Sequence, residues 1–108
     1  RVNVFGINYC QLIEREFDHA GFVETSLMMA IQPKLVQMEK CKKGYVDEKR
    51  LHATYSKFLI NPASFKITRN GVWGDPTKAC KKEGKKIISV AVKNLVRSIN
   101  ELDDLLRM

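Results

Sequence analysis

Evenly spaced aliphatic residues in the last third of the chain constrain its fold more than any other feature. Their intervals are four, three, four, three and four positions, at Ile88, Val92, Leu95, Ile99, Leu102 and Leu106. This spacing places them on one face of an α-helix, and Ala91 and Val96 widen the stripe. Asp75 and Pro76 suit the N-cap and the first helical position, so they predict where the helix begins. The stripe lasts for fewer than three heptads, which favours a helix packed on a core over a coiled coil.

A second helix is predicted over residues 21–31, where apolar side chains again recur at spacings of three and four. Glu24 lies in its first turn, where unpaired N–H groups and the positive end of the helix dipole attract negative charge. Gln32 and Pro33 end the helix, because the residue before a proline avoids helical geometry. Pro33 can then begin a further turn.

The opening residues, RVNVFGIN, have the pattern of a largely buried β-strand. A single strand cannot satisfy its backbone N–H and C=O groups without neighbours. Residues 39–74 are weakly patterned, with a charged EKCKKGYVDEKR stretch, a break at Asn61 and Pro62, and the start of a GVWGDP turn. Either this middle region supplies more strands or a larger sheet lies outside the sequence, and we favour the second.

Charge and cysteine content narrow the classes of function. The chain has 108 residues and a net charge of +7, which suits anionic partners such as phosphorylated small molecules, although charge balance alone is more often explained by a lysine-rich solvated surface. Nucleic acid is disfavoured as a partner, because the aromatic residues are scattered rather than interleaved with the lysines at positions 78–86. No apolar run approaches the roughly 18 residues that span a membrane. Free thiols in a reducing, cytoplasmic setting are predicted by three distant cysteines, Cys10, Cys41 and Cys80.

The segment EFDHAGFVETS concentrates ionisable side chains just before the first predicted helix, at Glu16, Asp18, His19 and Glu24. A neighbouring carboxylate favours a protonated imidazole and fixes its orientation, which suits a proton donor or shuttle. The alternative from spacing alone is a surface histidine in a loop. A metal site is disfavoured, because His-x-x-x-x-Glu is not a recognised ligand pattern and His52 is isolated.

Two segments of the chain resemble the creatininase family of metal-dependent amidohydrolases. In DHAGFVETSLMMAIQPKLVQM, the resemblance is to a His-(Ala/Gly)-Gly-x-x-Glu-Thr-Ser motif that opens a helix rich in Leu, Met and Ala and is followed by Pro-x-Leu-Val. GVWGDPTKACKKEGKKIISVAVKNL is similar to the C-terminal piece of the family, with a Gly-x-x-Gly-Asp-Pro-like turn, Glu-Gly and a final helix. The matches run in the same order from about Val2 to the end of the chain.

This resemblance implies an α/β fold in three layers, with a mainly parallel sheet flanked by helices. Residues 1–108 would then be the C-terminal portion of a single creatininase-like domain, and the N-terminal half of the enzyme would be its partner. A pair of divalent metal ions, Fe, Zn or Mn, is expected on that N-terminal half, because the family's Glu-x-His and Asn-Gly-His-x-Glu-Asn ligand segments do not occur here. The resemblance also implies a homo-oligomer, and no metal ligand is assigned to this chain.

The resemblance also assigns roles to particular residues. His19 matches the family's active-site histidine, which contacts the substrate and shuttles protons, and Glu24 matches a residue that supports the histidine loop. Asp18 replaces a Glu, keeps the charge and is expected to bind the substrate. Arg15 is a departure, because creatinine-hydrolysing members carry a Trp lid four positions before the histidine, whereas Arg can grip a phosphate by a two-pronged contact.

The implied activity is hydrolysis of an amide or formamide C–N bond. Arg15 and the basic charge favour the deformylases of the family, which act on a formylamino-ribosylaminopyrimidine monophosphate in the synthesis of riboflavin and deazaflavin cofactors. Two alternatives remain at this point. One is a creatinine-like cyclic amide as substrate, and the other is a basic interaction module without catalysis.

Overall fold

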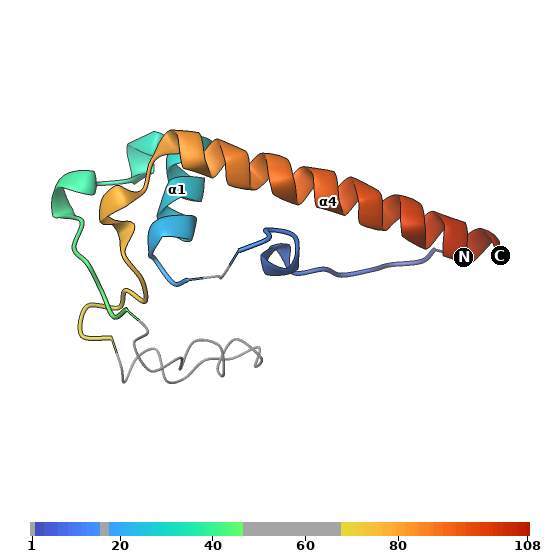
Figure 1. The fold of residues 1–108 in the computed structure, drawn as a ribbon, viewed down its shortest axis with the longest axis horizontal. Coiled ribbons are helices and arrows are strands. Elements are labelled where there is room, and N and C mark those ends of the chain that lie inside the picture. The colour runs from blue at the N-terminus through green and yellow to red at the C-terminus, as the bar shows by residue number, and fades with distance from the viewer. Residues whose placement is uncertain (1, 16–17, 47–67) are drawn as a thin grey trace.

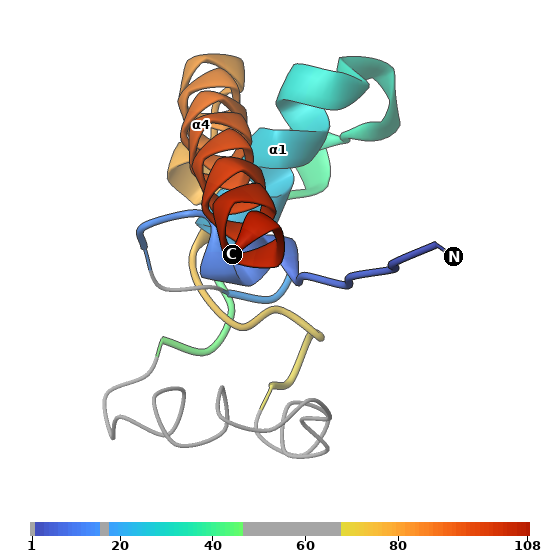
Figure 2. The same cartoon turned by 90° about the vertical axis from the view of Figure 1, so that its right-hand side faces the viewer.

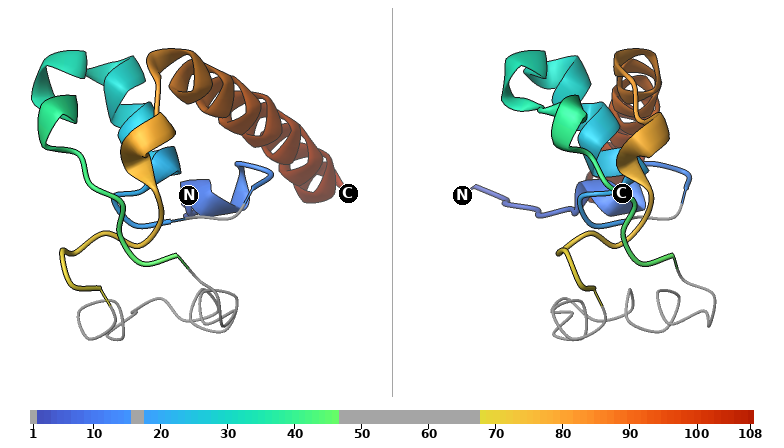
Figure 3. Two further views of the ribbon diagram at one scale, coloured as in Figure 1. Left: turned by 60° about the vertical axis from the view of Figure 1, so that its left-hand side comes forward. Right: turned by 90° about the vertical axis from the view of Figure 1, so that its left-hand side faces the viewer.

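The computed structural model describes residues 2–15, 18–46 and 68–108. Within these ranges the chain forms two α-helices, α1 (Phe22–Ile31) and α4 (Lys81–Arg107), which Figure 1 shows packed together at one end of α4. One short 3₁₀ turn, Tyr9–Gln11, precedes α1, and three more lie between the two helices, at Pro33–Leu35, Met38–Lys40 and Pro76–Lys78. Figure 3 shows the last of these turns beside α1, so segments from both halves of the chain meet there.

The predicted first helix is confirmed as α1. It ends at Ile31, where the N–H of Gln32 still donates to Met28 and Pro33 then opens a 3₁₀ turn. Both observations follow from the restricted backbone on either side of a proline. The apolar spacing therefore located this helix to within about one residue at each end.

The predicted C-terminal helix is confirmed as α4, but its predicted start is wrong. Asp75 caps the separate turn Pro76–Lys78, because its carboxylate accepts the N–H of Thr77 at 3.0 Å. Extended backbone at Cys80 follows, and α4 begins at Lys81. The cap and the proline thus start a single turn, which is all that their local chemistry requires.

The expected α/β fold with a mainly parallel sheet is contradicted by the described residues. They contain no strand and only two isolated β-bridges, which pair Trp73 with His19 and with Tyr45. The strand predicted at the start of the chain is not formed, and Val4 there is 87% exposed. Figure 2 shows this segment running outward from the helices. A strand needs a partner for its backbone groups, and this segment pairs with none of the described residues. Asn61, Pro62 and His52 lie outside the described residues.

The small core lies where α1 crosses the first turns of α4. Its buried members are Ile13, Val23 and Ile87, with Phe22, Leu27 and Ala91 packed around them. Gly84 allows the helices to approach closely, because a Cβ there would collide with the backbone carbonyl of Ser26 and lie 2.9 Å from Ala30 Cβ. The amide of Asn94 donates to the carbonyl of Leu12 at 2.7 Å and so fastens the N-terminal turn to α4.

The expectation that the whole apolar stripe of α4 packs on a core is wrong for its distal part, residues 92–107. Only the first turns pack on α1, and beyond them half or more of the surface of several apolar side chains is exposed, at Val92, Val96, Ile99, Leu105 and Leu106. Figure 1 shows this part of α4 extending past α1. Among the residues described, no helix has the length and apolar character needed to cross a membrane.

Candidate active site at the His19 loop

The His19 loop, residues 18–21, begins with a carboxylate that caps α1. Asp18 Oδ2 accepts the N–H of Val23 at 2.9 Å, and Oδ1 accepts the N–H of Glu24 at 3.4 Å. These N–H groups belong to the first turn of α1, where they have no partner within the helix. Both oxygens of Asp18 therefore face the positive end of α1.

Two glycines make room for this carboxylate. A Cβ on Gly21 would lie 2.7 Å from Asp18 Cγ and closer still to Oδ2. Gly74 has a φ of +127°, and a Cβ on it would lie 3.2 Å from Asp18 Cβ. A side chain at position 21 would push the carboxylate off the helix end. A side chain at position 74 would be strained by the positive φ and would crowd Asp18, so the loop geometry depends on both glycines.

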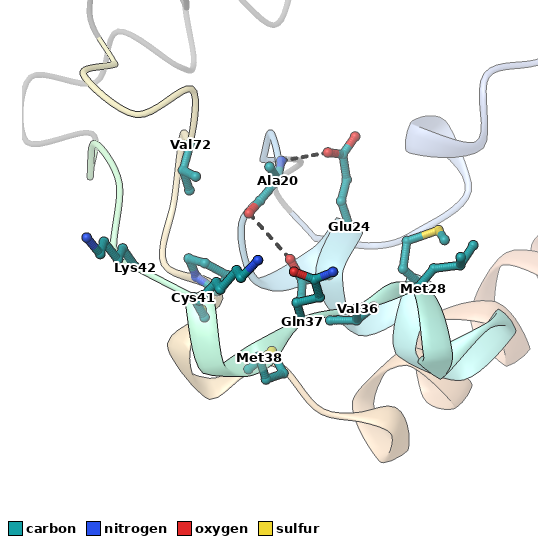
Figure 4. A pocket seen from close by; sticks show the side chains of 13 residues that line it. Ala20, Glu24, Met28, Val36, Gln37, Met38, Cys41, Lys42 and Val72 are labelled. Atoms are coloured by element: carbon teal, nitrogen blue, oxygen red, sulfur yellow. Dashed lines mark hydrogen bonds between the residues drawn. The ribbon is translucent and has the colours of Figure 1, made fainter.

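The Glu-Thr-Ser run of α1 holds the loop in place from the helix side. Glu24 Oε2 accepts the N–H of Ala20 at 2.6 Å, and the hydroxyl of Thr25 donates to the carbonyl of Ala20 at 3.4 Å. Figure 4 shows both contacts. Ser26 is fully buried and its Oγ accepts the N–H of Cys80 at 3.2 Å, directly before α4. One short sequence run thus connects the loop, α1 and the start of α4.

His19 combines a fixed backbone with an exposed ring. Its N–H donates to the carbonyl of Trp73 at 3.0 Å, and its carbonyl accepts the N–H of Trp73 at 2.8 Å. The imidazole keeps 60% of its side-chain surface exposed, and its Nδ1 lies 3.8 Å from Glu24 Oε2. That separation suits an ion pair with a protonated ring rather than a direct hydrogen bond. A ring held in this way is accessible to a ligand and has a carboxylate on one side.

Arg15 makes its contacts away from this cluster. Its guanidinium lies 3.8 Å from the carboxylate of Glu83 on α4 and 5.6 Å from the ring centre of Phe22. The structure therefore brings Asp18, His19 and Glu24 together, whereas Arg15 is directed toward the start of α4. Its side chain is 41% exposed, so the guanidinium remains accessible to solvent.

A cavity of about 390 Å³ opens beside the loop and was not predicted from the sequence. Ala20 and Glu24 line it from the α1 side, and Figure 4 shows Gln37, Met38 and Cys41 on the opposite side. Lys40 and Lys42 also belong to its lining. In the sequence, their stretch is marked only by its charge. No spacing in the sequence relates it to Glu24, because the turns after α1 bring the two together.

Tyr9 is a second residue that the sequence did not single out. It shares with Glu24 the lining of an apolar groove of about 540 Å³ between α1 and α4. Burial raises the pKa of the Tyr9 phenol to about 12, and the negative charge of Glu24 contributes in the same direction. Tyr9 is therefore a neutral hydroxyl near the supporting carboxylate at any physiological pH.

The described residues do not by themselves fit a metal centre. They contain no group of three or more His, Cys, Asp or Glu side chains close enough to hold an ion. Both oxygens of Asp18 and one oxygen of Glu24 already accept backbone N–H groups. In the part of the chain that the structure describes, the loop is built as a helix cap that presents an imidazole.

The comparisons with known proteins agree with the motif around His19. The sequence model of the creatininase family, described as creatinine amidohydrolase, matches residues 8–99. The chain therefore belongs to the creatininase family, whose membership indicates a metal-dependent amidohydrolase, a hydrolase acting on C–N bonds. Searches of curated proteins and of solved structures gave no significant match.

Proposed function

We propose that this chain supplies the proton-donating histidine of a hydrolase that cleaves the formamide of a formylamino-ribosylaminopyrimidine monophosphate. The observation that carries the proposal is the exposed imidazole of His19, bonded through its backbone to Trp73 and 3.8 Å from the carboxylate of Glu24. Membership of an amidohydrolase family supports the bond type. The phosphorylated substrate is the finer part of the proposal and has its own test.

Protonation of the leaving nitrogen is the step assigned to His19. Cleavage of an amide expels an amine, which leaves readily only when it receives a proton. Nδ1 of His19 lies 3.8 Å from Glu24 Oε2, so Nε2 is the ring nitrogen assigned to give its proton to the substrate. A positioned acid of this kind contributes about 10²–10⁴-fold to a rate. Glu24 would orient the ring, and Asp18 would hold the loop at the end of α1.

Basic side chains beside the loop, and Arg15 toward the start of α4, support an anionic substrate. Lys40 and Lys42 line the cavity that Ala20 and Glu24 also line, and Arg15 follows the first turn with a partly exposed guanidinium. Arg15 would exchange its ion pair with Glu83 for a phosphate, which it can grip through two N–H groups. The proposal also includes metal ions, a second half that carries their ligands and a homo-oligomeric assembly.

The test of the proton-donor role compares His19→Ala with the unchanged full-length protein. We expect kcat to fall by about 10²–10⁴-fold, the size of a general-acid contribution, while the bound metal stays the same. Metal is measured by atomic emission and folding by circular dichroism. Loss of metal from His19→Ala would show a ligand instead of a proton donor and would overturn the assignment.

The test of the substrate uses three compounds side by side: the formamidopyrimidine nucleotide, its dephosphorylated nucleoside and creatinine. Hydrolysis of the nucleotide with a KM at least about tenfold below that of the nucleoside is expected, because one charge-assisted phosphate contact contributes on the order of 1.5 kcal/mol or more. Arg15→Ala should raise the KM for the nucleotide alone, and Arg97→Ala on the exposed side of α4 is the matched control. Equal KM values for nucleotide and nucleoside, or a preference for creatinine, would reject the phosphorylated substrate.

A further inference from the structure

Three segments that are far apart in the sequence lie side by side behind His19. Trp73 is the middle one, bonded on one side to both backbone groups of His19. On its other side, Tyr45 N–H donates to the carbonyl of Val72 at 2.9 Å, and Gly74 N–H donates to the carbonyl of Tyr45 at 2.7 Å. Gly44 N–H donates to Gly74 at 3.0 Å. Backbone hydrogen bonds therefore connect the histidine to Tyr45 through Trp73.

The side chains strengthen this arrangement. The indole of Trp73 is buried, with 3% of the residue exposed, and the ring of Tyr45 meets it edge-on at 5.4 Å between ring centres and 83° between planes. Edge-to-face pairs of this geometry contribute about 0.5–1.5 kcal/mol beyond the area they bury. Asn70 adds two contacts, donating to the carbonyl of Lys43 at 3.3 Å and accepting the N–H of Val72 at 3.2 Å. The ring pair is the only aromatic pair found among the described residues.

We propose that the Tyr45–Trp73 ring pair is the positioning element for His19. The loop has no sheet around it within the described residues, so its place depends on its bonds to α1 and on the short segment that crosses it. Trp73 fixes the backbone of His19 directly, and Tyr45 fixes Trp73 from the opposite side. A catalytic group displaced by about 1 Å can lose on the order of 10²-fold in rate, so a buried indole held by a half-buried tyrosine ring behind the loop governs turnover without touching substrate.

The test separates the ring of Tyr45 from its hydroxyl. Tyr45→Ala removes the edge-on contact, Tyr45→Phe keeps it, and Val46→Ala trims the exposed neighbour as the matched control. The kinetic part rests on the proposed hydrolase, and we expect kcat of Tyr45→Ala to fall about tenfold or more with KM unchanged, because the proton donor is displaced while the substrate contacts stay. Tyr45→Phe and Val46→Ala should retain both values to within about twofold.

A second measurement does not depend on turnover. The chain has two histidines, so the His19 ring signal in a proton NMR spectrum is assigned by its loss in His19→Gln. We expect this signal to move in Tyr45→Ala and to stay in Tyr45→Phe and Val46→Ala. Movement of the signal in a protein that hydrolyses none of the three compounds would uphold the positioning role while rejecting the proposed function.

Two results would overturn the inference. One is a folded Tyr45→Ala protein in which neither the His19 signal nor kcat changes. The other is an equal fall in kcat for Tyr45→Phe and Tyr45→Ala, because the hydroxyl and not the ring contact would then be responsible. If Tyr45→Ala fails to fold, Trp73→Phe replaces it, since this change keeps an aromatic ring but shortens its reach to Tyr45. The His19 ring signal and kcat are then measured for Trp73→Phe in the same way.

Discussion

The His19 end of the molecule and the distal part of α4 are organised by opposite means. Around His19 the chain is irregular, yet its backbone groups are paired with segments that are remote in the sequence, and glycines allow close approach. The distal part of α4 is a regular helix whose apolar stripe is exposed. Its structure rests on hydrogen bonds within the helix and on side-chain pairs such as Arg107 with Asp103 at 2.7 Å.

This difference shows that regular secondary structure and tertiary contacts are separate properties of a segment. A helix draws most of its stability in proteins from packing of its apolar face, so the distal part of α4, apart from the bond of Asn94 to Leu12, contributes little to holding the described residues together. The irregular loop, by contrast, cannot change without breaking bonds to α1 and to the Trp73 segment. The candidate site therefore lies at the end of the molecule that is fixed most firmly.

The largest expected effect compares two isoleucines of α4. Ile87 is 3% exposed and belongs to the core, whereas Ile99 is 55% exposed on the distal part. Ile87→Ala should lower the free energy of unfolding by about 3 kcal/mol, because it removes buried methyl groups and leaves a cavity. Ile99→Ala should change it by less than about 0.5 kcal/mol. Urea unfolding followed by circular dichroism measures both.

The comparison breaks if Ile99→Ala proves as damaging as Ile87→Ala. That result would mean that the stripe of α4 is covered in solution by something other than the described residues. The double variant Ile87→Ala with Ile99→Ala tests whether the two sites are independent. If they are, its change in the free energy of unfolding should equal the sum of the two single changes.

A substitution at the helix crossing should give the next largest effect. Within a helix, Gly→Ala ordinarily stabilises by about 1 kcal/mol. At Gly84 the new Cβ would instead collide with the carbonyl of Ser26, which belongs to backbone and cannot move aside. Gly84→Ala should therefore lower the free energy of unfolding by about 2 kcal/mol, as overpacking does elsewhere.

Gly6→Ala is the matched control, because a Cβ at Gly6 would meet no atom within 4 Å. Thermal unfolding of the two variants is compared at equal protein concentration, and we expect a lower melting temperature for Gly84→Ala than for Gly6→Ala. A rise in melting temperature for Gly84→Ala would mean that α1 and the start of α4 are not in close contact, and the fixed end of the molecule would lose its main support.

Local patterns predicted the elements that depend on neighbouring residues only. The spacing of apolar residues predicted both helices, and Pro33 predicted the end of α1, because periodicity and proline act within a few positions. The same logic misplaced the start of α4, since Asp75 and Pro76 are equally satisfied by one 3₁₀ turn. The strand expected at the start of the chain also had a local pattern, but a strand requires pairing partners that no local pattern supplies.

The residues of the candidate site also fall into a group that local sequence predicted and a group that it did not. His19 and Glu24 were predicted together because they belong to one short motif. Trp73, Tyr45 and the cavity lining at Lys40 were missed, because turns and backbone bonds bring them to the loop from remote positions. The family match covers residues 8–99 and supports the motif without describing these contacts.

The helix cap is expected to show a smaller effect than the core. Asp18→Ala should lower the free energy of unfolding by about 1 kcal/mol, since two N–H groups of α1 lose their acceptor. Asp18→Asn keeps a side-chain oxygen in the same place and should lose less than half of that. Chemical denaturation of the three proteins tests the order, and an equal loss for both variants would show that charge and not capping is what the loop needs.

The smallest expected effect comes from Ala20, whose φ of +51° lies in the left-handed region. A residue with a Cβ pays about 1–2 kcal/mol to adopt this backbone, and glycine does not. Glycine also adds about 0.4–1 kcal/mol of unfolded-state entropy, so Ala20→Gly should raise the free energy of unfolding by only about 0.5 kcal/mol. The hydrogen bond from Ala20 N–H to Glu24 hardly depends on the side chain at position 20, so kcat should stay the same. A lower melting temperature in Ala20→Gly would show that the loop is relaxed rather than held in a strained conformation by Trp73 and Glu24, and the contrast with the distal part of α4 would then rest on packing alone.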